Sequence, residues 1–82
     1  MNETQIYDKV VSLISPYAKN REAMTVASRE TKILEDLGVN SARLVDIVLA
    51  FEDAFDIEVE DEAADNIFTI GDAVTLINGK LN

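Results

Sequence analysis

The chain has 82 residues, of which 48% are hydrophobic, and it contains neither cysteine nor histidine. This composition predicts one folded domain over residues 1–82, and it excludes disulfides, thiolate zinc sites and a histidine base. The net charge of −9 lies entirely in residues 44–82, where ten acids face Lys80 alone, so basic protein surfaces are favoured partners while nucleic acid and anionic membranes are not. No signal peptide or membrane-spanning run is recognisable, so a cytoplasmic location is expected. The protein is also expected to be a monomer.

The first predicted helix begins after Asn2 and ends near Ser15. Gln5 stands at the capping-box position relative to Asn2, and Pro16 is expected to end or bend the helix. Its apolar residues recur at helical spacing and are Ile6, Val10, Leu13 and Ile14.

A long connection over residues 17–40 follows, polar at first and apolar towards its end. A structureless loop of that length is unusual in a small domain, so its second half is expected to pack on the core. A short helical turn closed by Gly38 is predicted there.

The second predicted helix runs from about Ser41 to Ala54 or Phe55. Its apolar face is formed by Leu44, Ile47, Val48, Phe51 and Phe55.

Two further helices complete the prediction. A short segment from Asp61 to about Asn66 has acids in its first turn, which a helix N-terminus favours. The last helix has Thr69 as its expected N-cap and Asp72 three residues later, with Phe68 positioned as a hydrophobic staple.

Ser41 has two interpretations. Serine is a favoured N-cap, so a purely structural role at the start of the second helix explains it locally. A functional role rests on the stretch beginning at Leu37, "LGVNSARLVDIVLAFEDAFDIEVEDEAADNIFTIGDAVTLI", which resembles the acyl carrier proteins and their LG-x-DSL pattern. This resemblance implies an all-α, acyl-carrier-like four-helix bundle with three longer helices, a short third helix and a long first loop.

The same resemblance implies a role for Ser41 as the attachment point of 4′-phosphopantetheine. The thiol of that cofactor would carry acyl intermediates of fatty acid, polyketide or related biosynthesis as thioesters, so the chain itself needs no cysteine. A phosphodiester at the start of a helix is also electrostatically favourable. The implied partners are a phosphopantetheinyl transferase and enzymes that load, transfer or condense acyl groups.

Three residues beside Ser41 depart from the family pattern. Gly38 matches the pattern, but Asn40 replaces the usual aspartate, Ala42 replaces leucine, and Arg43 reverses a common charge. We interpret the chain as a specialised carrier served by a restricted set of enzymes.

An acidic and apolar face of the second helix is the predicted surface for partners with basic docking patches. Exposed ion pairs contribute only about 0–1 kcal/mol each, so docking is expected to be weak and reversible. The predicted partner-binding residues are Leu44, Val45, Asp46, Leu49, Glu52, Asp53 and Asp61.

Other functions are open from the residues alone. An unmodified, carrier-like interaction module would use the acidic face while Ser41 only caps a helix. Calcium binding is suggested by the acids from Asp53 to Asp65, but their spacing lacks the glycine and final glutamate of an EF-hand, so no metal site is assigned. An enzyme is the least favoured class, and no catalytic residue is assigned.

Overall fold

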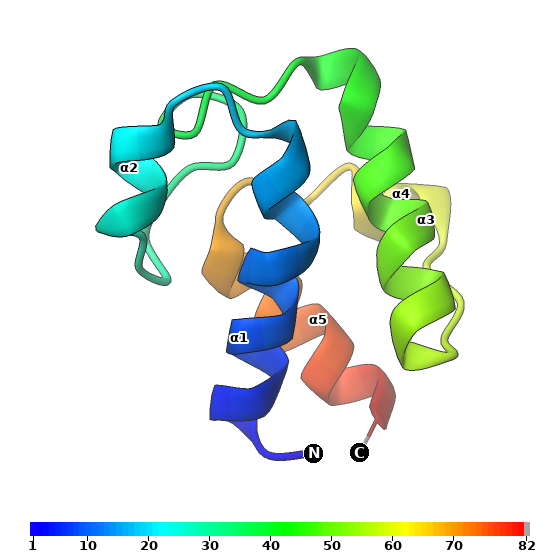
Figure 1. Cartoon of the computed structure of the whole chain (residues 1–82). Helices are drawn as coiled ribbons and strands as arrows, with labels where there is room; N and C mark the ends of the chain where they lie inside the picture. The colour runs from blue at the N-terminus through cyan, green and yellow to red at the C-terminus, as the bar shows by residue number, and fades with distance from the viewer. Residues whose placement is uncertain (82) are drawn as a thin grey trace.

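Three long helices build most of the core in the computed structural model, which describes residues 1–81 (Figure 1). They are α1 (Glu3–Ile14), α3 (Leu44–Phe55) and α5 (Ile70–Leu81). The shorter elements are η1 (Ser15–Tyr17), α2 (Arg21–Thr25), η2 (Ser41–Arg43) and α4 (Asp61–Ala64). The N-terminus and the end of α5 lie at one end of the molecule, whereas η2 and the start of α3 lie at the other (Figure 1).

The predicted all-α class is confirmed over residues 1–81, where the only β-type pairing is an isolated bridge between Lys32 and Thr69. Within the same residues, no helix combines the length and the apolar character needed to cross a membrane.

The capping box predicted for α1 is present. The Asn2 side-chain oxygen accepts the Gln5 backbone N–H at 2.8 Å, and the Gln5 side-chain oxygen accepts the Asn2 backbone N–H at 2.9 Å. Two backbone donors at the helix start are thereby satisfied. The helix ends at Ile14, one residue earlier than predicted, and Pro16 stands in the 3₁₀ turn that follows.

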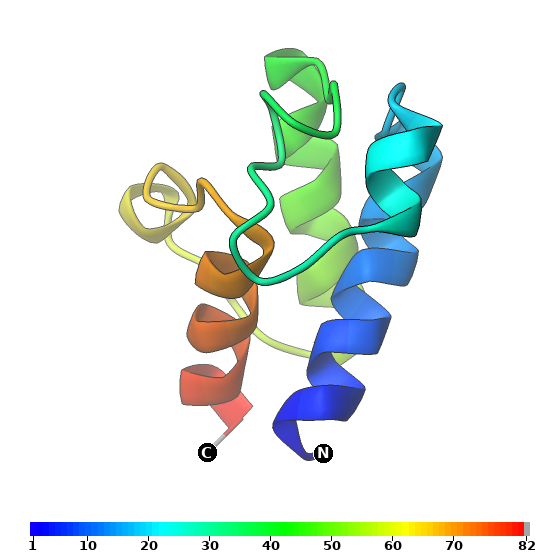
Figure 2. The same ribbon diagram turned by 90° about the vertical axis from the view of Figure 1, so that its left-hand side faces the viewer.

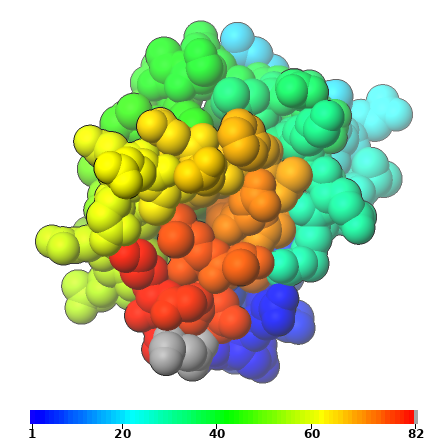
Figure 3. All heavy atoms as spheres, turned by 180° about the vertical axis from the view of Figure 1, so that it is seen from behind, coloured from blue at the N-terminus to red at the C-terminus, as the bar shows by residue number. Residues whose placement is uncertain are grey.

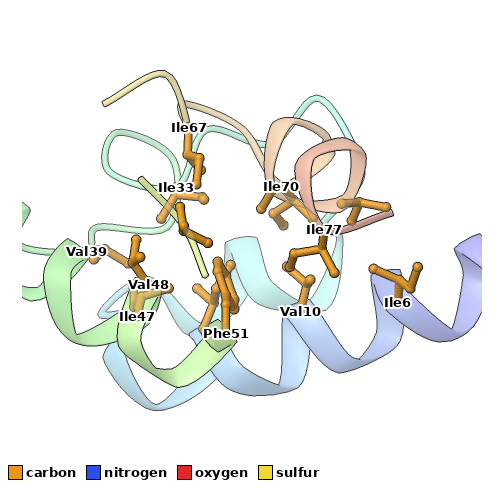
Figure 4. Packing of buried hydrophobic residues seen from close by; sticks show 14 of the residues in the cluster. Ile6, Val10, Ile33, Val39, Ile47, Val48, Phe51, Ile67, Ile70 and Ile77 are labelled. Carbon is orange, nitrogen blue, oxygen red and sulfur yellow. The ribbon is translucent and has the colours of Figure 1, made fainter. Parts of the chain in front are cut away.

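Phe51 lies at the centre of one apolar core (Figure 4). Side chains from the three long helices and from the loops surround it, and among residues 1–81 no polar or charged residue is buried. The largest fully buried side chains are Phe51, Ile6, Ile14, Ile33, Leu37, Ile47, Ile70, Ile77, Val10 and Val74.

The long connection contains a helix that the sequence prediction missed. α2 occupies its polar first half, and the Asn20 side-chain oxygen caps it by accepting the Ala23 N–H at 3.1 Å. This helix has only five residues and buries none of them fully, so it leaves no apolar periodicity to detect. The predicted turn before Gly38 is present, because the Lys32 carbonyl accepts the N–H groups of Asp36 and Leu37.

The second half of this connection is pinned to the start of α5, as predicted. Figure 2 shows the teal loop crossing towards the orange start of α5. The backbone N–H of Ile33 donates to the Phe68 carbonyl at 2.9 Å, and that of Ile70 donates to the Thr31 carbonyl at 3.0 Å. The staple predicted for Phe68 is wrong, because its carbonyl accepts a hydrogen bond from this loop and the residue as a whole is 63% exposed.

The predicted cap of α5 is formed by Thr69 and Asp72. The Thr69 hydroxyl accepts the Asp72 N–H at 3.0 Å, while the Asp72 carboxylate accepts the N–H groups of Phe68 and Thr69, each at 3.0 Å. These backbone donors hold the pKa of Asp72 below its usual 3.8.

We expect the Asp72 carboxylate to make stability depend on pH in the acid range. Because folding lowers its pKa, its contribution is present above the unfolded pKa of about 3.8 and is lost as the pH falls through the folded value. Urea unfolding at a series of pH values should therefore show that the difference in the free energy of unfolding between the wild type and Asp72→Asn becomes smaller below pH 3.8. A difference that stays constant down to pH 2 would contradict this expectation.

Candidate functional site

Ser41 is the first residue of η2, and its side chain is exposed. The alternative interpretation of Ser41 as a helix N-cap is wrong, because Asn40 fills that position. The Asn40 side-chain oxygen accepts the Ala42 N–H at 2.9 Å, and its carbonyl accepts the Arg43 N–H at 2.8 Å. Within residues 1–81 no hydrogen bond of the Ser41 hydroxyl occurs, so this group is free for chemistry and is not used by the cap.

The turn before Ser41 depends on Gly38. Its φ of 67° is the left-handed conformation that glycine adopts without a steric penalty. The preceding carbonyl, from Leu37, accepts the Asn20 N–H at 3.0 Å, and the following residue, Val39, is buried. The segment that leads to Ser41 is therefore fixed from both sides.

A cavity of about 260 Å³ lies between α3 and α4, with Ser41 among the residues that line it. Figure 3 shows the yellow segment that contains α4 lying between the green start of α3 and the red α5. Apolar side chains form most of the lining, and acids complete it. The lining residues are Ser41, Leu44, Val45, Val48, Leu49, Glu52, Val59, Asp61, Ala64 and Asp65.

Comparison with known proteins decides the family. The sequence model of the family described as "Phosphopantetheine attachment site" matches residues 21–77. The chain belongs to this family of carrier proteins.

Two whole-chain similarities support this assignment. An acyl carrier protein of Prochlorococcus marinus (strain MIT 9515) is 43% identical over an alignment 84 positions long, which covers 98% of both proteins. The solved structure of the acyl carrier protein from Enterococcus faecalis, described for its high thermal stability, has a TM-score of 0.80 and 30% identity. That match covers 98% of this chain and 99% of the other.

Acyl carrier proteins bear covalent 4′-phosphopantetheine and act as carriers, not as enzymes. They are served by a phosphopantetheinyl transferase and by biosynthetic enzymes. The site of this carrier fits that cofactor, because an exposed serine hydroxyl that is not used as a helix cap stands beside an apolar cavity. When bound, the cofactor supplies a thiol to a chain that has none.

The residues predicted to bind partners fall into two groups. Leu44, Val45, Leu49, Glu52 and Asp61 line the cavity together with Ser41, and Val45 and Leu49 are 64% and 55% exposed. The structure brings these residues together.

The remaining two predicted residues do not line the cavity. Asp53 is exposed on α3, and Asp46 forms an ion pair with Arg43 at 3.1 Å. The apolar residues Val59 and Ala64 line the cavity but were absent from the prediction. Val59 stands out as an apolar residue in an acidic stretch, and this was the signal available in the sequence.

Glu52 has a structural contact as well as a place in the cavity. Its carboxylate accepts the Val59 backbone N–H at 2.9 Å and so ties the loop before α4 to α3. Next to this tie, Glu60 pairs with Lys80 of α5 at 2.8 Å. The hydrogen bond and charge of Lys80 lower the pKa of Glu60. The segment that forms one wall of the cavity is thus held at two neighbouring points.

We expect Glu52→Ala to lower the free energy of unfolding by about 1 kcal/mol, because the half-buried Val59 N–H loses its acceptor. Hydrogen exchange of the Val59 amide should become faster at the same time, and the two effects are measured by urea unfolding and NMR. Asp53→Ala removes a neighbouring exposed acid of α3 and serves as the matched control. Equal exchange rates in the two variants would show that the tie does not hold the loop.

Proposed function

We propose that Ser41 carries the 4′-phosphopantetheine of this acyl carrier protein and that the α3–α4 cavity receives the acyl chain. The observation that carries the proposal is the exposed Ser41 hydroxyl, which the Asn40 cap leaves free at the edge of the cavity. With coenzyme A as donor, a phosphoester bond forms at Ser41 Oγ while the bond from the same phosphorus to 3′,5′-ADP breaks. The serine proton passes to a base, and because the chain has no histidine we assign this base to the transferase.

The apolar lining of the cavity supports a role in sheltering the cargo. Each methylene group removed from water contributes about 0.8 kcal/mol, so even a short acyl chain would gain from lying against Leu44, Val48 and Val59. An acyl chain that fills this space would exclude water from it, and this would help to protect a nearby thioester from hydrolysis.

Delivery to partner enzymes would use the exposed part of the same surface. Val45 and Leu49 offer apolar contact, and Asp53 and Asp61 lie exposed on α3 and α4. Basic patches on partners would be attracted to these acids at long range, while each exposed pair adds about 0–1 kcal/mol. We propose a monomeric cytoplasmic carrier that visits its enzymes through short encounters.

The test is the intact mass of the apo protein after incubation with coenzyme A and a panel of phosphopantetheinyl transferases. The expected result is a gain of one phosphopantetheine group on the wild type and none on Ser41→Ala, with unchanged circular dichroism. Cofactor uptake by Ser41→Ala would place the attachment elsewhere. No uptake by a folded wild type with any transferase would favour an unmodified interaction module.

The residues around Ser41 predict that few phosphopantetheinyl transferases recognise this carrier efficiently. We expect the double variant Asn40→Asp, Ala42→Leu to be loaded faster than the wild type by a broad-specificity transferase, because it regains a charge and an apolar contact. Aspartate is as good an N-cap as asparagine, so the turn should be preserved. The measurement is the initial rate of coenzyme A-dependent mass gain, and equal rates would remove the support for a specialised carrier.

A further inference from the structure

A second cavity is lined by residues that flank Ser41. It is an open space of about 530 Å³ between η1 and η2, within the range of ligand sites in proteins. Ser41 lines the apolar cavity, whereas its neighbours Asn40 and Arg43 line this one. The complete lining is Pro16, Tyr17, Ala18, Lys19, Asn40 and Arg43.

The lining of this cavity is basic in an otherwise acidic protein. Lys19 and Arg43 contribute two positive charges, and no acid is among the lining residues. The Lys19 ammonium makes no hydrogen bond or ion pair within residues 1–81. Arg21, in contrast, donates to the Ser15 carbonyl at 2.7 Å and is already committed.

Arg43 is only weakly engaged. Its ion pair with Asp46 joins side chains that are 63% and 42% exposed, and such pairs contribute about 0–1 kcal/mol. A phosphodiester at the cavity can therefore compete with Asp46 for the guanidinium. Phosphate oxygens, like carboxylates, accept charge-assisted hydrogen bonds, and the planar guanidinium can donate two at once.

The position of Lys19 is fixed relative to the Ser41 turn. The N–H of the next residue, Asn20, donates to the Leu37 carbonyl at 3.0 Å, and the Asn20 side chain donates to the Asp36 carbonyl at 3.1 Å. A Cβ at Gly38 would lie 3.4 Å from the Lys19 Cβ, so the two segments are in close contact. The backbone and Cβ of Lys19 are thus held beside the turn that leads to Ser41.

We propose that Lys19 and Arg43 hold the phosphodiester of the cofactor arm in this basic cavity when no partner enzyme is docked. The inference rests on the proposed attachment at Ser41. Ser41 stands between Asn40 and Arg43 in the chain, and both of these line the cavity, so a phosphodiester linked to Ser41 would have a high effective concentration there and even weak contacts would retain it. The arm would then begin in the basic cavity, between η1 and η2, and its acyl end would have to pass Ser41 to reach the apolar one.

The test uses the loaded protein, with ³¹P NMR of the phosphodiester and amide exchange as readouts. In the wild type, loading should shift the amide signals of Lys19 and Arg43 and slow exchange in residues 17–20. Lys19→Gln and Arg43→Gln should each move the ³¹P resonance towards its position in unfolded loaded protein, and added salt should do the same to the wild type. Lys80→Gln removes the same charge beside Glu60 and should leave the resonance unchanged.

The outcomes separate this inference from the proposed function. Mass spectrometry first establishes loading, and a folded protein that takes up no cofactor overturns both proposals. A loaded protein whose ³¹P resonance is the same in the wild type, Lys19→Gln and Arg43→Gln overturns the basic site alone. A shift caused equally by Lys80→Gln would assign the effect to overall charge and would also overturn it.

Discussion

Phe51→Ala is expected to lower the free energy of unfolding by about 3–5 kcal/mol, the usual cost of truncating a buried aromatic side chain. Phe51 is 1% exposed and lies between the helices and the loop residues of the core (Figure 4). A domain of this length has a total stability of only about 4–12 kcal/mol. The loss is therefore a large fraction of the total, and part of the variant should be unfolded at 37 °C.

Urea and thermal unfolding measure this effect. For a domain of this size the expected loss corresponds to a fall in Tm of at least about 12 °C. Leu49→Ala is the matched control, because it truncates a large apolar residue of the same helix that is 55% exposed. Its Tm should stay close to that of the wild type, and a similar fall in both variants would contradict the central role assigned to Phe51.

Gly71→Ala is expected to destabilise the fold although alanine is the better helix former. A Cβ at this position would lie 2.8 Å from the Arg29 carbonyl oxygen, which also accepts the Gly71 N–H at 2.8 Å. The Arg29 side chain holds this segment in place, because it donates to Glu3 at 2.7 Å and to Thr75 at 3.0 Å. Overpacking of this kind costs about 1–3 kcal/mol, which offsets or exceeds the helix-propensity gain of about 1 kcal/mol.

Gly79→Ala provides the control for this prediction within the same helix. Nothing lies within 4 Å of a Cβ at Gly79, so only the propensity gain applies there. Urea unfolding should show a lower midpoint for Gly71→Ala and a higher one for Gly79→Ala. If both variants had a higher urea midpoint than the wild type, the segment around Arg29 would be able to move away from the new Cβ without a loss of stability.

Features that depend on neighbours in the sequence could be predicted. The Asn2–Gln5 and Thr69–Asp72 caps were readable because each links residues three apart. The long helices were readable because their buried residues recur with the helical period.

Features set by distant contacts could not be predicted in the same way. Phe68 has the spacing of a staple, but its backbone pairs with Ile33, and the ring is left in solvent. Asn40 occupies the N-cap position considered for Ser41. Both residue types are good N-caps, and the conformation of the turn after Gly38 sets which of them occupies the position. The contact of Glu52 with Val59 joins residues seven apart through a loop, which no periodic pattern reveals.

The candidate site shows the same division. The LG-x-DSL resemblance pointed to Ser41, but the two cavities lined by Ser41 and by its neighbours arise where α3 meets α4 and where η1 meets η2. Lys19 is 22 positions away along the chain and resembles any surface lysine in the sequence. Only the fold places it beside the turn.

The N-terminus and the end of α5 lie together at the end of the molecule opposite η2 (Figure 1). An affinity tag, a bead or a fused neighbouring domain attached there would hold the chain by the end remote from Ser41. Immobilised protein should therefore present the serine outward, and enzymes in solution could reach it without competing with the tether. The fold is therefore suited to attachment through its termini, with the η2 end left free.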